Sequence, residues 1–207
     1  MNDSGFAGPQ TALAAANWGG GPTPRPVIRA YAQVKLAALT AARETDGQAK
    51  RPTWDEATWS LISRALADIR EGVHDDLFVV PLAQGGAGTS LNMNLNEAVV
   101  RVVRTVGGPE LHPLEDINRY QSTNDTFPTA ATILAYEALT ATETRVIRLQ
   151  EELVRREKQW ATQVMVGRTE LQDALPVTLG QVFASWAGPF ERDRWRLNKL
   201  RERIRTV

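Results

Sequence analysis

A long apolar face at helical spacing between residues 130 and 163 constrains this chain more than any other feature of its sequence. Apolar side chains recur at helical spacing, three, four, seven or eight positions apart, at Ala131, Leu134, Ala138, Val146, Leu149, Leu153 and Trp160. At 1.5 Å per residue, such a helix is roughly 50 Å long, which exceeds what a small domain can bury against itself. A second long pattern follows over residues 179–204. Two helices of this length predict part of an extended helix bundle, and such bundles are often oligomeric.

Shorter helical patterns fill the N-terminal part of the chain. One begins at Val27 and stops at Asp46 and Gly47. A second begins with Thr53 and Glu56, which are spaced as a capping box, and ends at Gly72. The chain length of 207 residues is ample for a sizeable core. The sequence therefore predicts an all-α, mainly helical fold.

Breakers and polar stretches divide these patterns. Residues 1–26 are rich in glycine and proline and predict an irregular lead-in. Phe78, Val79 and Val80 form a short extended candidate. Residues 112–129 are polar, contain prolines and predict a loop. We expect a helical N-terminal domain over residues 1–129 and a partial helix-bundle domain over residues 130–207.

Composition excludes several classes of protein. The chain has no cysteine, which excludes disulfides, a thiolate nucleophile and thiolate metal sites. Its 24 basic and 24 acidic residues give no net charge, so no global field favours nucleic acid or an anionic membrane. No stretch approaches the roughly 20 apolar residues of a membrane span, and the first residues do not form a secretory signal. These features predict a cytoplasmic protein with neither nucleic acid nor a membrane as its partner.

A glycine run opens the first polar cluster, over residues 84–97. Gly85, Gly86 and Gly88 precede Thr89 and Ser90, either of which could cap a third helix. Glycines let an anion approach the backbone, and the helix N-terminus attracts carboxylate or phosphate. The lysine of a phosphate loop and the third glycine of a dinucleotide fingerprint are both replaced, which disfavours nucleotide binding. The alternative is a well-capped helix start with no ligand.

Two further polar clusters flank the long helical pattern. Residues 121–129 read QSTNDTFPT and again offer neutral donors at a helix entrance. Neutral donors suit a site that stabilises an oxyanion without holding a competing permanent charge, although an ordinary helix cap has the same composition. Residues 167–181, taken alone, predict a polar loop between the two long helices.

In this order, the motifs GGAGTSLNMNLNEA, QSTNDTFPTA and GRTELQDALPVTLGQ resemble the aspartase/fumarase superfamily, and most closely the aspartate ammonia-lyases. The resemblance covers residues 27–207. It implies a helical lyase domain followed by two long helices of an incomplete oligomeric bundle, which forms a tetramer in the family. It also implies a β-elimination that converts L-aspartate to fumarate and ammonia through an aci-carboxylate dianion, with no cofactor and no metal.

The same resemblance assigns roles to individual residues. Thr89 and Ser90 are expected to bind a substrate carboxylate. Ser122, Thr123 and Asn124 are expected to contact the substrate and stabilise the dianion, with Ser122 among the catalytic residues. Thr169 and Glu170 are expected to complete the catalytic set, Thr169 from a neighbouring subunit. A small dicarboxylate or aspartate is the implied ligand.

Two departures from the family pattern bear on function. Glu170 stands where many members have histidine, and a carboxylate there favours a substrate that carries an ammonium group. The family's Gly-Ser-Ser loop, with the serine base, is expected beyond residue 207. The implied partners are therefore further copies of this chain or a complementary C-terminal lyase fragment. The alternatives are a class II fumarase-like hydratase and a truncated, non-catalytic paralogue that serves as a binding module.

Overall fold

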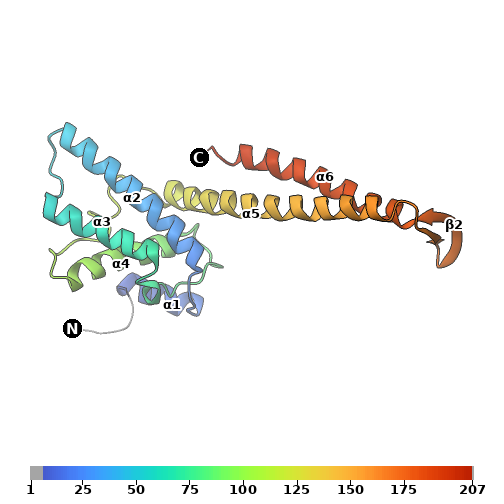
Figure 1. The fold of residues 1–207 in the computed structure, drawn as a ribbon. Coiled ribbons are helices and arrows are strands. Elements are labelled where there is room, and N and C mark those ends of the chain that lie inside the picture. The colour runs from blue at the N-terminus through green and yellow to red at the C-terminus, as the bar shows by residue number, and fades with distance from the viewer. Residues whose placement is uncertain (1–6, 207) are drawn as a thin grey trace. The chain divides into compact units, whose positions relative to one another are not determined.

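The computed structural model describes residues 7–206, and these residues are mainly helical, which confirms the predicted fold class (Figure 1). The elements are α1 (Pro9–Trp18), α2 (Arg25–Gln48), α3 (Glu56–Glu71), a short 3-10 helix (Asp75–Leu77), α4 (Thr89–Thr105), α5 (Thr123–Gln159), β1 (Val164–Thr169), β2 (Gln172–Thr178) and α6 (Leu179–Arg203). The chain divides into two compact units between Leu134 and Ala135, a point inside α5. The predicted domain boundary at residue 130 stays a prediction.

The first unit packs α2, α3 and α4 around one apolar core, as their sequence patterns predict. Its innermost side chains are Leu39, Ile62, Leu66, Ile69, Leu95, Val99 and Val103, each less than 2% exposed. The α3 helix ends at Gly72, which has the left-handed φ of 90° that favours glycine at this position. Its predicted cap is wrong: Asp55 replaces Thr53, because the Asp55 carboxylate accepts a hydrogen bond from the Thr58 N–H at 2.7 Å.

The predicted irregular lead-in over residues 1–26 is wrong for Pro9–Trp18, which form α1, while residues 1–6 lie outside the described part of the chain. The physical reason is a carboxylate supplied by α4. Glu97 is 3% exposed and accepts hydrogen bonds from the Gln10 N–H at 2.9 Å and from the Thr11 N–H and hydroxyl at 2.8 and 2.6 Å. A carboxylate at this end of a helix satisfies its free N–H groups and interacts favourably with its dipole.

Phe78–Val80 form no strand, contrary to the extended candidate. They follow the 3-10 helix and hydrogen-bond to the connection between α1 and α2 instead, with the Gly21 N–H donating to the Val79 carbonyl at 3.0 Å. Thr23 donates its hydroxyl to the Val80 carbonyl at 2.6 Å. These contacts fix the chain just before the glycine run.

The predicted loop over residues 112–129 ends earlier than expected, because α5 begins at Thr123 rather than near residue 130. Pro128 lies inside this helix. A proline there lacks the N–H that would bond the preceding turn, so the sequence alone favours a later start. Thr126 and Ala130 are 5% and 3% exposed, and their packing holds this turn against the rest of the first unit.

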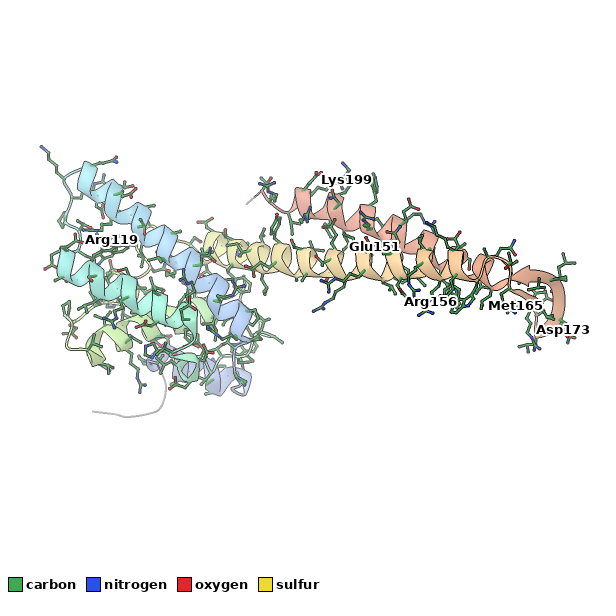
Figure 2. The ribbon with its side chains drawn as sticks, viewed as in Figure 1. Arg119, Glu151, Arg156, Met165, Asp173 and Lys199 are labelled. Atoms are coloured by element: carbon green, nitrogen blue, oxygen red, sulfur yellow. The ribbon has the colours of Figure 1, made fainter. Side chains whose placement is uncertain are left out.

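The second unit consists of the rest of α5, a β-hairpin and α6 (Figure 1). The predicted polar loop between the long helices is wrong over β1 and β2, which pair as antiparallel strands (Figure 2 labels Met165 and Asp173). Glu170 and Leu171 make the two-residue turn with φ of 49° and 63°, and tight hairpins of this kind need positive φ at both positions.

The second long helix is confirmed as α6. Thr178 and Gln181 form a capping box at its start. Two contacts hold α6 along α5: Arg201 pairs with Glu143 at 2.6 Å, and Arg194 donates to the Gln150 side chain at 3.2 Å. Just beyond the end of α5, the Trp160 ring lies 5.1 Å from that of Phe183 in α6.

Candidate functional site

The N-terminus of α4 carries the first group of predicted site residues. Gly88, with a left-handed φ of 81°, is the N-cap, so the expectation that Thr89 or Ser90 caps this helix is wrong. Both residues lie inside the first turn, and Thr89 donates its hydroxyl to the Gly86 carbonyl at 2.7 Å, closing the glycine turn. Thr89 is exposed and Ser90 is half-buried. The first turn of α4 contains no acidic residue.

The N-terminus of α5 carries the second group. Ser122 precedes the helix, and its hydroxyl oxygen accepts from the Asn124 N–H at 3.1 Å. Its carbonyl accepts from the N–H groups of Asp125 and Thr126 at 3.1 and 3.0 Å. Thr123 and Asn124 are therefore the first two helical residues. Ser122 and Asn124 are exposed and Thr123 is half-buried, so this segment presents neutral polar groups at the surface of the unit.

The two helix starts meet at Gly88. A methyl group built on Gly88 would lie 2.3 Å from Cγ of Phe127, which shows that the end of the glycine run lies against the second turn of α5. The Phe127 ring in turn packs edge-on against Tyr31 of α2 at 6.1 Å. Each helix N-terminus carries partial positive charge, which attracts an anion, while Asp125 adds one negative charge in the first turn of α5. Thr89, Ser90 and Ser122–Asn124 all belong to this junction.

Thr169 and Glu170 lie at the β-hairpin of the second unit, and both are exposed. Arg168 and Asp173 form an exposed ion pair at 3.4 Å across the same strands. Glu170 therefore lies exposed at the hairpin turn. The catalytic roles of Thr169 and Glu170 stay predictions.

Sequence reasoning missed a buried polar network beneath the α5 start. Lys35 of α2 is fully buried and donates to the side-chain oxygens of Asn92 at 2.8 Å and Asn118 at 3.2 Å. Asn92 also donates to Asn118 at 2.9 Å, and Asn118 donates to the Gln121 carbonyl at 3.1 Å. The available signal was a lysine on the mainly apolar inner face of a helix, since a lysine is rarely buried without a partner.

Burial lowers the pKa of Lys35 from 10.5 to about 7. The unfolded chain keeps the Lys35 proton up to a higher pH than the folded chain does. Between about pH 7 and pH 10.5 the unfolded state therefore binds more protons than the folded state. The free energy of unfolding is therefore expected to rise with pH above about 7, by an amount on the order of 2 kcal/mol by pH 9. This range lies below the pKa of Tyr31, which burial raises to about 12.

Urea denaturation of the wild-type chain and the Lys35→Met variant across this pH range checks the expectation. The variant should lack the rise. An exposed lysine, Lys50, supplies the matched control in Lys50→Met. Equal slopes for all three chains would contradict the assignment of the pH dependence to Lys35.

One cavity of the first unit is not lined by the predicted site residues. This cavity of about 520 Å³ is lined in part by Arg51, Asn118, Arg119 and Tyr120, and Thr89 and Ser122 do not line it (Figure 2 labels Arg119). No group of three or more His, Asp or Glu side chains within residues 7–206 is arranged to hold a metal ion. Across the same residues, no helix is both long and apolar enough to cross a membrane.

Comparison with known proteins identifies the family. The pattern of the family described as Lyase matches residues 25–207. The chain is 37% identical to aspartate ammonia-lyase of Helicobacter pylori (strain J99) over 80% of its own length and 36% of that protein. It is 47% identical to a class II fumarate hydratase of Mycobacterium tuberculosis over 63% of its length and 27% of that protein.

A solved structure supports the same family. A fumarate lyase:delta crystallin from Brucella melitensis superposes with a TM-score of 0.84 at 35% identity, covering 99% of this chain and 48% of that one. The chain therefore belongs to the aspartase/fumarase superfamily of lyases, as its three motifs indicated. It spans about a third of the length of the two curated relatives it matches.

Proposed function

We propose that this chain forms part of an aspartate ammonia-lyase, which eliminates ammonia from L-aspartate to give fumarate. A base removes a proton from the carbon beside one carboxylate, the electron pair is held as an aci-carboxylate dianion, and the C–N bond then breaks to release ammonia. The serine base belongs to the Gly-Ser-Ser loop that the family resemblance places beyond residue 207. This chain's own residues would bind the substrate and stabilise the dianion.

The junction of the α4 and α5 starts is the observation that carries this proposal. The contact between Gly88 and Phe127 brings together two helix N-termini, one of which carries the acidic Asp125 in its first turn. The polar side chains of Thr89, Ser90 and Ser122–Asn124 at this junction are hydroxyls and an amide. Donors of this kind, held in place before the reaction, stabilise negative charge that develops in a transition state. Thr89 and Ser90 would bind a substrate carboxylate, and Ser122, Thr123 and Asn124 would stabilise the dianion.

Glu170 favours aspartate as the substrate. A carboxylate near a dicarboxylate substrate repels it unless the substrate also carries a positive group. The ammonium group of L-aspartate supplies that charge, and malate does not. Fumarate hydration is the second candidate, and the 47% identity to the mycobacterial class II fumarate hydratase favours it.

We also propose that the active enzyme contains several polypeptide copies or a complementary C-terminal lyase segment. Large apolar side chains of α6 are exposed in the single chain, with Trp186 52%, Trp195 65% and Leu200 46% accessible. Exposed large apolar side chains along one helix favour contact with another chain. Thr169 and Glu170 would reach the substrate from a neighbouring copy. With no cysteine to oxidise, the protein suits the reducing cytoplasm.

The decisive experiment follows fumarate formation by ultraviolet absorbance, from L-aspartate and separately from L-malate. The chain is assayed alone and after addition of a C-terminal lyase fragment that carries the Gly-Ser-Ser loop, with sedimentation to show that the two associate. We expect turnover of L-aspartate only in the complex. Turnover of L-malate instead would establish the hydratase. No fumarate formation from either substrate, in a complex that is shown to form, would favour a non-catalytic paralogue.

A further inference from the structure

Two buried side chains of α2 are linked by hydrogen bonds to residues on either side of the segment that carries Ser122, Thr123 and Asn124. Tyr31 and Lys35 are four residues apart, so they share one face of the helix. They are 2% and 0% exposed. Neither belongs to the proposed substrate-binding set, and a charged lysine in a core position requires an explanation.

Lys35 holds the chain before Ser122. Its ammonium nitrogen donates to the Asn118 side-chain oxygen at 3.2 Å, and Asn92 braces the same oxygen at 2.9 Å. With its oxygen fixed, the Asn118 amide is oriented so that its nitrogen donates to the Gln121 carbonyl at 3.1 Å. Gln121 is the residue immediately before Ser122. The lysine thus fixes the peptide at the entrance of the segment through one intermediate side chain.

Tyr31 holds the chain after Asn124. The Thr126 hydroxyl donates to the Ser122 carbonyl at 3.1 Å, which uses its single proton. The Tyr31 hydroxyl, 3.1 Å from the Thr126 oxygen, is therefore the donor in that pair. The Ser122 carbonyl also accepts the Asp125 and Thr126 N–H groups. The phenol thus orients the hydroxyl that fixes Ser122.

We infer that Tyr31 and Lys35 are positioning residues that hold both ends of the Ser122–Asn124 segment in its ligand-binding conformation. As a role in catalysis, this inference rests on the proposed function, but the order of the segment can be measured without it. A site residue displaced by a fraction of an ångström loses much of its effect. One helix face would therefore set the geometry of three substrate contacts.

Amide hydrogen exchange of the full chain tests the positioning role. The variants are Tyr31→Phe and Lys35→Met, and the reporters are the Asp125 and Thr126 amides, which bond to Ser122. Loss of one hydrogen bond from this network should speed their exchange about five- to tenfold. The amides of Leu66 and Ile69 in the core of α3 should keep their rates. Tyr136→Phe and Lys50→Met, which change the same groups elsewhere, should leave every reporter unchanged.

Two results would overturn the inference. One is an unchanged exchange rate at Asp125 and Thr126 in both variants. The other is an equal acceleration at the α3 reporters, which would mean that the variants only weaken the whole fold.

The catalytic consequence is measured in the complex with the C-terminal lyase fragment. Tyr31→Phe is expected to lower kcat per folded molecule about tenfold, whereas a merely structural role would lower only the amount of folded protein. A wild-type complex without turnover would refute the proposed function, while the exchange rates would still decide the inference. An active wild-type complex with an unchanged Tyr31→Phe kcat would refute the catalytic role alone.

Discussion

Replacing Thr123 by valine is expected to lower kcat/KM of the complemented enzyme by roughly 10²- to 10³-fold. The substitution keeps the branched shape and removes one hydroxyl at the α5 start. Removal of a single donor that stabilises a developing oxyanion has an effect of this size in other enzymes. Because Thr123 is half-buried and lies in the first helical turn, the change should leave the fold intact.

Thr132→Val is the matched control, since Thr132 lies further along the same helix within the first unit. Both variants are assayed for fumarate formation and for thermal unfolding. The control should retain wild-type kcat/KM. A Thr123→Val enzyme with wild-type kcat/KM would exclude Thr123 from the substrate contacts and weaken the case for the whole α5 start as an oxyanion site.

Gly88→Ala is expected to destabilise the first unit by about 3 kcal/mol. A left-handed residue with a side chain costs about 1 to 2 kcal/mol, and the new methyl group would lie 2.3 Å from Cγ of Phe127. Crowding of a packed aromatic ring adds a further 1 to 3 kcal/mol. Gly86→Ala is an internal reference, because Gly86 has nearly the same φ and no atom within 4 Å of the added carbon.

Urea denaturation gives both free energies of unfolding. Gly86→Ala should cost about 1 to 2 kcal/mol, which isolates the conformational part. The combination of Gly88→Ala with Phe127→Leu should be less destabilising than the sum of the two single changes, since the smaller side chain relieves the clash. Equal effects of Gly86→Ala and Gly88→Ala would show that the glycine run and α5 are not in contact.

Local signals were sufficient to locate α2, α3, α4 and α6 from the sequence. The apolar spacing is regular in each of them, and a breaker lies close to an end in two of them, as Gly47 does for α2 and Gly72 for α3. The apolar faces of α2, α3 and α4 also agree with the burial found in the structure, whereas Trp186 and Leu200 of the α6 pattern are exposed. Periodicity and capping act over a few residues, and a single sequence displays them directly.

Interactions between distant residues account for what the sequence did not reveal. The α1 helix is held by Glu97, and its glycine-rich surroundings concealed it. The hairpin depends on positive φ at Glu170 and Leu171, residue types that rarely adopt it. Family motifs identified Ser122–Asn124 as a candidate site. Tyr31 and Lys35 belong to α2, whose apolar spacing indicated only a core helix, so their hydrogen bonds to Thr126 and Asn118 were not predicted.

The bond between Glu97 and α1 has a consequence for synthesis on the ribosome. Thr11 and Glu97 are 86 positions apart in the chain, so the carboxylate that completes α1 is made several seconds after the helix itself at ordinary translation rates. During that interval the α1 sequence has its N-terminal amides open to solvent or to chaperones. Although α1 is made before α4, it is thus secured only after α4 has emerged from the exit tunnel.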